Sequence, residues 1–155
     1  MNQPETLTIK AALKVAKPVQ QVFEAIADPV HMSHYFISHS TGRMEAGKTV
    51  QWQFPEFEGQ FPVRVHQVEP HHLLSFFWDD MDGTETKVEI RLQPKDEATF
   101  VTITEGSKAN NEAGIGWLMR NTEGWANFLA CLKAYLEYGI NLRKGAFDPS
   151  QMPVQ

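Results

Sequence analysis

The sequence has very little cysteine and no long apolar run. Cys131 is the only thiol among 155 residues, so the chain cannot form an internal disulfide. This favours a reducing compartment. No stretch approaches the about 18 consecutive apolar residues of a membrane span, and the N-terminal residues lack the basic start and apolar run of a secretory signal. We therefore expect a cytoplasmic protein that makes no contact with membranes.

Basic residues are also scarce. Lysine and arginine total 14 against 19 acidic residues, which gives a net charge of −5. Nucleic acids and anionic membrane surfaces both require a basic patch, so neither is an expected partner. The chain contains no internal repeat, low-complexity tract or linker. Its length is typical of one domain, predicted to span residues 1–155 with a core at about 6–143 and a loose tail from Lys144.

Signatures of catalysis and of metal binding are lacking. The six histidines are not arranged as a set of three or four converging ligands, and we expect them to be solvated. The acidic run 79–83 lacks the ligand spacing of a calcium loop and is expected to be a hairpin turn. Cys131 lies among apolar neighbours and is expected to be a structural, buried thiol. No paired acid and base is visible, so the sequence favours a protein without cofactor or metal, and a binding protein over an enzyme.

The most prominent element present is a long helix predicted from Gly116 to Gly139. Its apolar residues recur at helical spacing and form one broad stripe, while Arg120 and Glu123 lie on the opposite side. A helix of this length is not stable alone in water and must pack on an apolar surface of similar length. The segment Ser107–Gly116 before it is rich in Gly, Asn and Ser and is predicted to be a flexible loop that could gate entry to a cavity.

Upstream segments predict strands and two short helices. Alternating apolar residues indicate a first strand at Thr6–Val15, and helical spacing indicates helices at about 18–27 and 30–36, the second capped by Asp28. Between Gly42 and Glu105 a series of alternating segments is separated by short turns, which is typical of an antiparallel meander. The sequence therefore predicts an α+β domain in which a curved antiparallel sheet wraps around the long C-terminal helix, with the two short helices after the first strand.

The inner face of this sheet is rich in aromatic residues. A curved sheet and a straight helix diverge toward one end, so we expect a cavity there, and such pockets are mostly apolar. Its few polar groups are expected near the start of the helix, toward the open end, from Arg120, Asn121, Thr122 and Glu123. The candidate ligand-binding residues are Trp52, Phe54, Phe61, Val63, Phe76, Trp78, Ile90, Thr122, Trp125 and Leu129.

Three stretches together resemble a known family. These are Ala16–Pro29 with its Pro-x-x-x-Val-Phe opening helix, Val68–Trp78 with its strand–Pro–strand ending in Trp, and the closing Glu105-Gly106 followed by the helix from Gly124-Trp125 to Gly139. The order is similar to that of the helix-grip fold of the START-like (SRPBCC, Bet v-like) superfamily. Within it, the chain resembles the family named for the activator of the heat-shock-protein-90 ATPase. One departure is Ala46-Gly47, where the family usually has paired glycines.

The resemblance implies a domain built around a ligand cavity, but a fold does not by itself define a function. The first hypothesis is a carrier or sensor that binds a small hydrophobic or aromatic molecule between sheet and helix. The alternative is a stress-related, co-chaperone-like partner of a heat-shock-protein-90-type ATPase. A further alternative is a cyclase- or hydrolase-type enzyme. The sequence leaves the ligand and the oligomeric state open.

Overall fold

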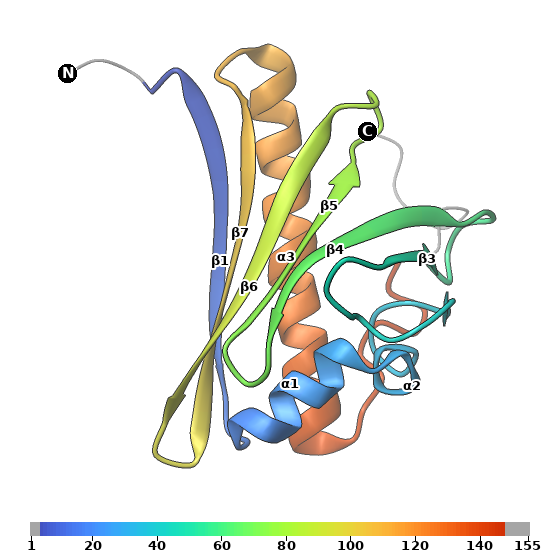
Figure 1. The fold of residues 1–155 in the computed structure, drawn as a ribbon, viewed down its shortest axis with the longest axis vertical. Helices are drawn as coiled ribbons and strands as arrows, with labels where there is room; N and C mark the ends of the chain where they lie inside the picture. Colours follow the sequence, from blue (N-terminus) through green and yellow to red (C-terminus); the bar gives the residue numbers. More distant parts are fainter. Residues whose placement is uncertain (1–3, 148–155) are drawn as a thin grey trace.

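A computed structural model describes residues 4–147 of the chain. Seven strands form one antiparallel sheet in the order β1-β7-β6-β5-β4-β3-β2 (Figure 1). The strands are β1 Thr6–Val15, β2 His39–Ser40, β3 Thr49–Gln53, β4 Phe61–Glu69, β5 Leu73–Asp79, β6 Glu85–Lys95 and β7 Ala98–Ala109. The helices are α1 Val19–Ala27, α2 Pro29–Met32 and α3 Glu112–Tyr138.

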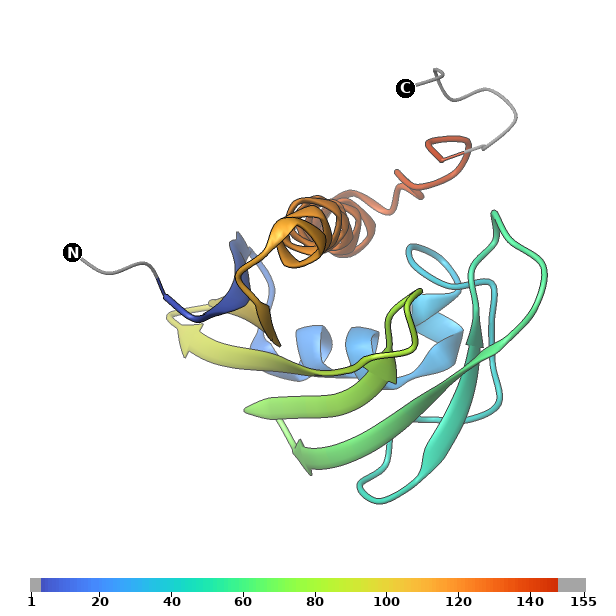
Figure 2. The same ribbon diagram turned by 90° about the horizontal axis from the view of Figure 1, so that it is seen from above.

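The predicted α+β architecture is confirmed. The strands follow the predicted alternation: in β6, Val88 and Ile90 are buried on the face toward α3, and Lys87, Glu89 and Arg91 on the other face are more exposed. The sheet is curved and α3 lies within its concave side (Figure 2). In the same view α3 lies over the β1 and β7 side, and the sheet curves away from it toward β3 and β4. The two layers therefore diverge on the β3–β5 side.

The long helix packs by its apolar stripe. Trp125, Phe128 and Leu132 are all buried against the sheet and the short helices. It ends at Gly139, whose φ of 68° is the left-handed conformation that glycine adopts most easily at a helix C-terminus. No helix within residues 4–147 is long and apolar enough to cross a membrane.

The predicted flexible loop at 107–116 is wrong. Strand β7 continues to Ala109 because Leu7 and Thr6 of β1 still pair with it there, and α3 already begins at Glu112. The Asn111 side chain accepts a hydrogen bond from the backbone N–H of Gly114 at 2.8 Å, which caps the helix. Because these residues belong to regular elements, the proposed gating role for this segment has no basis.

The two short helices form as predicted, with one difference in length. Val22, Phe23 and Ile26 bury one face of α1. The Asp28 carboxylate accepts from the Val30 N–H at 2.9 Å and so caps α2, as the sequence indicated. That helix ends at Met32, and the chain then turns through Tyr35 rather than continuing as a helix to residue 36.

Tyr35 provides a first test of this packing through alkaline pH. Its ring is 1% exposed, its hydroxyl donates to the Ala25 carbonyl at 2.8 Å, and burial raises the pKa of the phenol well above its usual range. Above about pH 10 the unfolded chain loses this proton while the folded chain retains it, so the free energy of unfolding decreases by up to about 1.4 kcal/mol per pH unit. Below about pH 10 the phenol is neutral in both states, and Tyr35 makes its full contribution to the free energy of unfolding.

The control is Tyr35→Phe, which removes the titrating group. Because it also removes the hydrogen bond to Ala25, we expect it to be about 1 kcal/mol less stable at neutral pH. Urea denaturation at rising alkaline pH should show the difference between wild type and variant shrinking. If the free energy of unfolding changed with pH in the same way for both proteins, the alkaline loss of stability would not come from Tyr35.

Candidate functional site

A buried carboxylate lies at the centre of the site. Glu105 of β7 is 1% exposed, yet both of its oxygens are fully engaged. Oε2 accepts from the indole N–H of Trp78 at 2.9 Å and from the Thr86 hydroxyl at 2.6 Å. Oε1 accepts from the indole N–H of Trp125 at 2.8 Å and from the Asn121 amide at 3.1 Å. We call these five residues the Glu105 cluster.

The cluster joins both layers of the fold. Trp78, Thr86 and Glu105 come from β5, β6 and β7, which are neighbouring strands, while Asn121 and Trp125 are one turn apart on α3. A carboxylate removed from water is costly unless hydrogen bonds replace its hydration, and bonds to a charged acceptor are stronger than neutral ones. Four such bonds fix the position of each donor, including the planes of both tryptophans. The indole rings stack with centroids 5.4 Å apart.

Three adjoining hollows lie beside this cluster, between α3 on one side and β4, β5 and the β3–β4 and β5–β6 connections on the other. Their volumes are about 200, 510 and 640 Å³, and Asn121 lines all three. We call them together the aromatic groove. Its apolar walls are formed by Phe36, Phe54, Phe57, Phe61, Trp78, Met81, Trp125 and Phe147. The rings of Phe54 and Phe61 lie 5.1 Å apart, and Phe61 is 6.2 Å from Trp78, so the aromatic lining is continuous.

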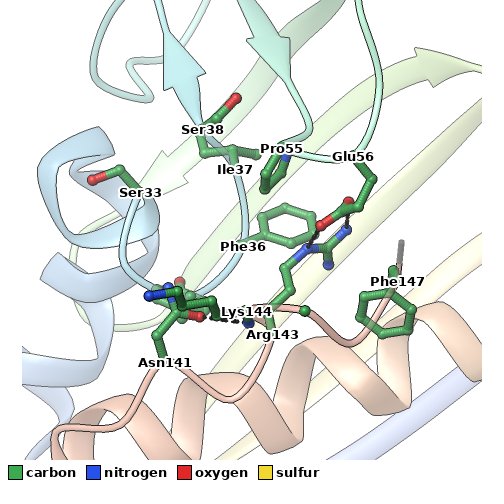
Figure 3. Close-up of a pocket in the computed structure, with 12 residues that line it drawn as sticks. Ser33, Phe36, Ile37, Ser38, Pro55, Glu56, Asn141, Arg143, Lys144 and Phe147 are labelled. Atoms are coloured by element: carbon green, nitrogen blue, oxygen red, sulfur yellow. Dashed lines mark hydrogen bonds and ion pairs between the residues drawn. The ribbon is translucent and has the colours of Figure 1, made fainter. Parts of the chain in front are cut away.

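Arg143 closes one end of the groove. It lies in the segment after α3, and its Nη2 and Nε contact the two oxygens of Glu56 at 2.7 and 3.1 Å (Figure 3). Its guanidinium also lies over the rings of Phe36, Phe54 and Phe147, at 5.7, 5.2 and 4.9 Å from their centroids. Beyond it is a further hollow of about 480 Å³, shown in Figure 3. Arg143 therefore separates this outer hollow from the aromatic groove.

The described part of the predicted loose tail, residues 144–147, belongs to this region. Phe147 lines the groove through its contact with Arg143. The remainder of that prediction, residues 148–155, lies outside the described residues.

Charged residues line the opposite rim. Asp80 pairs with Lys108 at 2.6 Å and lies 3.8 Å from Arg120. Burial by itself lowers the pKa of Lys108, but its hydrogen bonds to Asp80 and Asp82 raise the pKa overall, so the amine stays charged. The rim thus carries paired charges of both signs. Its exposed apolar side chains are Phe57, 59% exposed, and Met81, 85% exposed.

The structure separates the ten predicted ligand-binding residues into groups. Phe54, Phe61, Trp78 and Trp125 line the aromatic groove. Five others are buried in the core beneath it and do not line a described hollow: Trp52, Val63, Phe76, Ile90 and Leu129. Thr122 is half-buried and is also absent from the lining. Arg120, Asn121 and Glu123, which were expected near the open end, do line the groove.

Sequence reasoning did not identify Glu105 or Thr86 as site residues. A signal was present in the alternation of β7, where Glu105 follows Val101 and Ile103 on the buried face. A carboxylate on a core-facing position requires donors nearby, which is a reason to search for them. The donors themselves come from elements distant in sequence, so their identity requires the register of the sheet.

Other potentially reactive groups do not assemble into a catalytic arrangement within the described chain. Residues 4–147 contain no cluster of three or more His, Cys, Asp or Glu suited to a metal ion. Cys131 is buried on α3, and burial raises the pKa of its thiol, which opposes formation of the nucleophilic thiolate. Glu105 is an unsuitable general base for a groove ligand because it is buried and already accepts from four donors.

Comparison with known proteins gives the family. Residues 16–137 match the family described as "Activator of Hsp90 ATPase homolog 1-like protein". The chain belongs to this family. No curated protein matches it. The family and its START-like fold are those that the sequence motifs indicated.

Solved structures of similar proteins agree with this assignment. Protein SSP2350 from Staphylococcus saprophyticus is 31% identical, with a TM-score of 0.78, covering 88% of this chain and 96% of that one. DynU16, from the dynemicin biosynthetic locus, is 28% identical with a TM-score of 0.77. The match covers 91% of this chain and 50% of the DynU16 chain. The Aha1 dimer of Colwellia psychrerythraea, at 18% identity and a TM-score of 0.72, covers 86% and 98% and shares the fold.

Proposed function

We propose that this protein binds a small hydrophobic or aromatic molecule in the aromatic groove, as a carrier or sensor. The observation that carries this proposal is a groove lined by rings from both layers, with its two tryptophans held by the Glu105 cluster. Because the cluster fixes these rings before any ligand arrives, little conformational entropy is lost when a ligand stacks on them. Apolar burial at about 25 cal/mol per Å² then supplies the affinity.

The test is a binding assay with a neutral aromatic probe. N-phenylnaphthylamine becomes fluorescent in apolar surroundings, and its emission should rise when it is titrated with the protein. We expect Phe54→Ala to weaken this binding about tenfold, because it removes one aromatic wall and the burial that the wall provides. The half-buried Phe54 ring lies directly in the lining.

A matched control is Phe100→Ala, which removes a partly exposed ring from β7 that does not line the aromatic groove. It should leave the dissociation constant of the probe unchanged. Thermal melting of both variants verifies that they are folded at the assay temperature. Equal affinities of the two variants would show that the probe binds elsewhere, and no binding by wild type would count against the proposal.

The co-chaperone alternative is supported by the description of the family alone. It predicts that the protein raises the ATPase rate of a heat-shock-protein-90-type chaperone through surface contacts. An ATPase assay with and without the protein separates the two functions, since a ligand carrier has no reason to change that rate. Stimulation that persists in Phe54→Ala would make the surface function the better account.

A further inference from the structure

Asn121 is the one side chain that connects the Glu105 cluster to the whole aromatic groove. It lines each of the three hollows, and its amide nitrogen lies 3.1 Å from Glu105 Oε1. Its position on α3, one turn before Trp125, places both side chains on the groove side of the helix. Asn121 is therefore both a member of the buried cluster and part of the surface that a ligand meets.

The orientation of this amide follows from its partner. Glu105 Oε1 also accepts from the indole N–H of Trp125, which can only donate. Oε1 thus acts as an acceptor, and the NH₂ end of the Asn121 amide, rather than its carbonyl, must face it. The carbonyl oxygen Oδ1 is then the end of the amide left for the groove. Across residues 4–147, none of the hydrogen bonds found ends on Oδ1.

The indole donors next to Asn121 are already used, and the guanidinium of Arg120, which lines two of the hollows, is half exposed and lies 3.8 Å from Asp80 on the rim. Both indole N–H groups of the groove point away from it, to Glu105. At the far end, Nε and Nη2 of Arg143 are held by Glu56. The inner groove thus combines aromatic walls with a hydrogen-bond acceptor, and a ligand must satisfy that acceptor or leave it without a partner.

We propose that Asn121 Oδ1 selects apolar or aromatic ligands that carry a hydroxyl or N–H donor. This inference rests on the proposed function and names the ligand class of the same groove. The hydroxyl or N–H of such a ligand replaces the hydrogen bond from water that Asn121 Oδ1 loses when the ligand binds. An ether or a bare hydrocarbon of the same shape leaves the carbonyl desolvated and unpaired, which is the condition under which a polar site discriminates most strongly.

The experiment compares naphthol with its methyl ether and with naphthalene, by displacement of N-phenylnaphthylamine. For wild type we expect naphthol to bind about threefold to tenfold more tightly than either analogue, the range of one neutral hydrogen bond. Asn121→Leu should bring the three affinities close together. Because the readout is a ratio within one protein, a modest loss of stability in the variant does not affect it.

Asn127→Leu is the matched control. Asn127 also lies on α3 and lines the outer part of the groove, but it has no link to Glu105. This variant should keep the wild-type preference for naphthol. Equal affinities in wild type, or a preference that survives in Asn121→Leu, would overturn the inference while leaving the proposed function intact. Failure of all three compounds and of the probe to bind would overturn the proposed function itself.

Discussion

Replacing Glu105 with glutamine is expected to lower the free energy of unfolding by about 2–3 kcal/mol, the cost of an orphaned buried donor and of weaker neutral hydrogen bonds. The side chains have nearly the same shape, so packing is unchanged. Glutamine has only one acceptor oxygen, however, and its NH₂ must face one pair of donors. The least costly choice places it toward Thr86, whose hydroxyl can rotate to accept. Trp78, which can only donate, then loses its partner.

A double-mutant cycle identifies the orphaned donor. If Trp78 is the orphaned donor, Trp78→Phe should cost less in the Glu105→Gln background than in wild type, because phenylalanine has no N–H to leave unpaired. Urea denaturation followed by far-ultraviolet circular dichroism measures all four proteins without depending on tryptophan emission.

Glu89→Gln is the matched control for the loss of a carboxylate. Glu89 is on β6, and its ion pairs with Lys87 and Arg91 are partly exposed to solvent. Glu89→Gln should lower the free energy of unfolding by at most about 1 kcal/mol. If Glu105→Gln proved no more costly than Glu89→Gln, the carboxylate would not be the organising group described above.

Gly114→Ala is expected to destabilise the fold by about 3 kcal/mol or more, at or beyond the upper end of overpacking effects. A Cβ at this position lies 1.9 Å from the Ala109 carbonyl oxygen and 3.3 Å from Asn111 Oδ1. Either the end of β7 or the first turn of α3 must move, and both are held by hydrogen bonds at Asn111. The same denaturation assay measures the loss.

Gly124→Ala, in the same helix, should have the opposite effect. Nothing lies within 4 Å of its added Cβ, so alanine should stabilise the helix by about 0.5–1 kcal/mol through its lower conformational entropy in the unfolded chain. If the two alanine variants shifted stability alike, the tight approach of α3 to β7 would not be the reason for glycine at 114.

The contrast between these glycines also explains which parts of the fold were predictable. Strand β1 was placed correctly because alternation is a local signal. The start of α3 was missed because Asn110, Asn111, Gly114 and Gly116 have the composition of a loop. Gly114 is within the helix because the end of β7 leaves no room for a side chain there, and that close approach is tertiary information.

The candidate site shows the same limit. Periodicity placed Trp52, Phe76 and Trp78 on one face of the sheet, but whether such a ring is core or lining depends on which other side chains cover it. The rings of Phe36, Phe61, Phe76 and Trp78 surround Trp52, and Phe76 lies between Trp52 and Trp125, so both Trp52 and Phe76 are core; Trp78 stacks on Trp125 and still lines the groove. Glu105 was visible as a residue of the family motif, but its four donors come from two other strands and a helix. Only the assembled sheet register brings them together.

Two apolar side chains of the groove rim come from connections between strands rather than from the sheet itself. Phe57 and Met81 belong to the connections β3–β4 and β5–β6, outside the hydrogen-bonded network around Glu105. Substitutions at these two positions alter the shape of the groove without removing a hydrogen-bond partner from the Glu105 carboxylate. Under the proposed function, substitutions at the rim would therefore change the preferred ligand while leaving intact the hydrogen bonds that stabilise the domain.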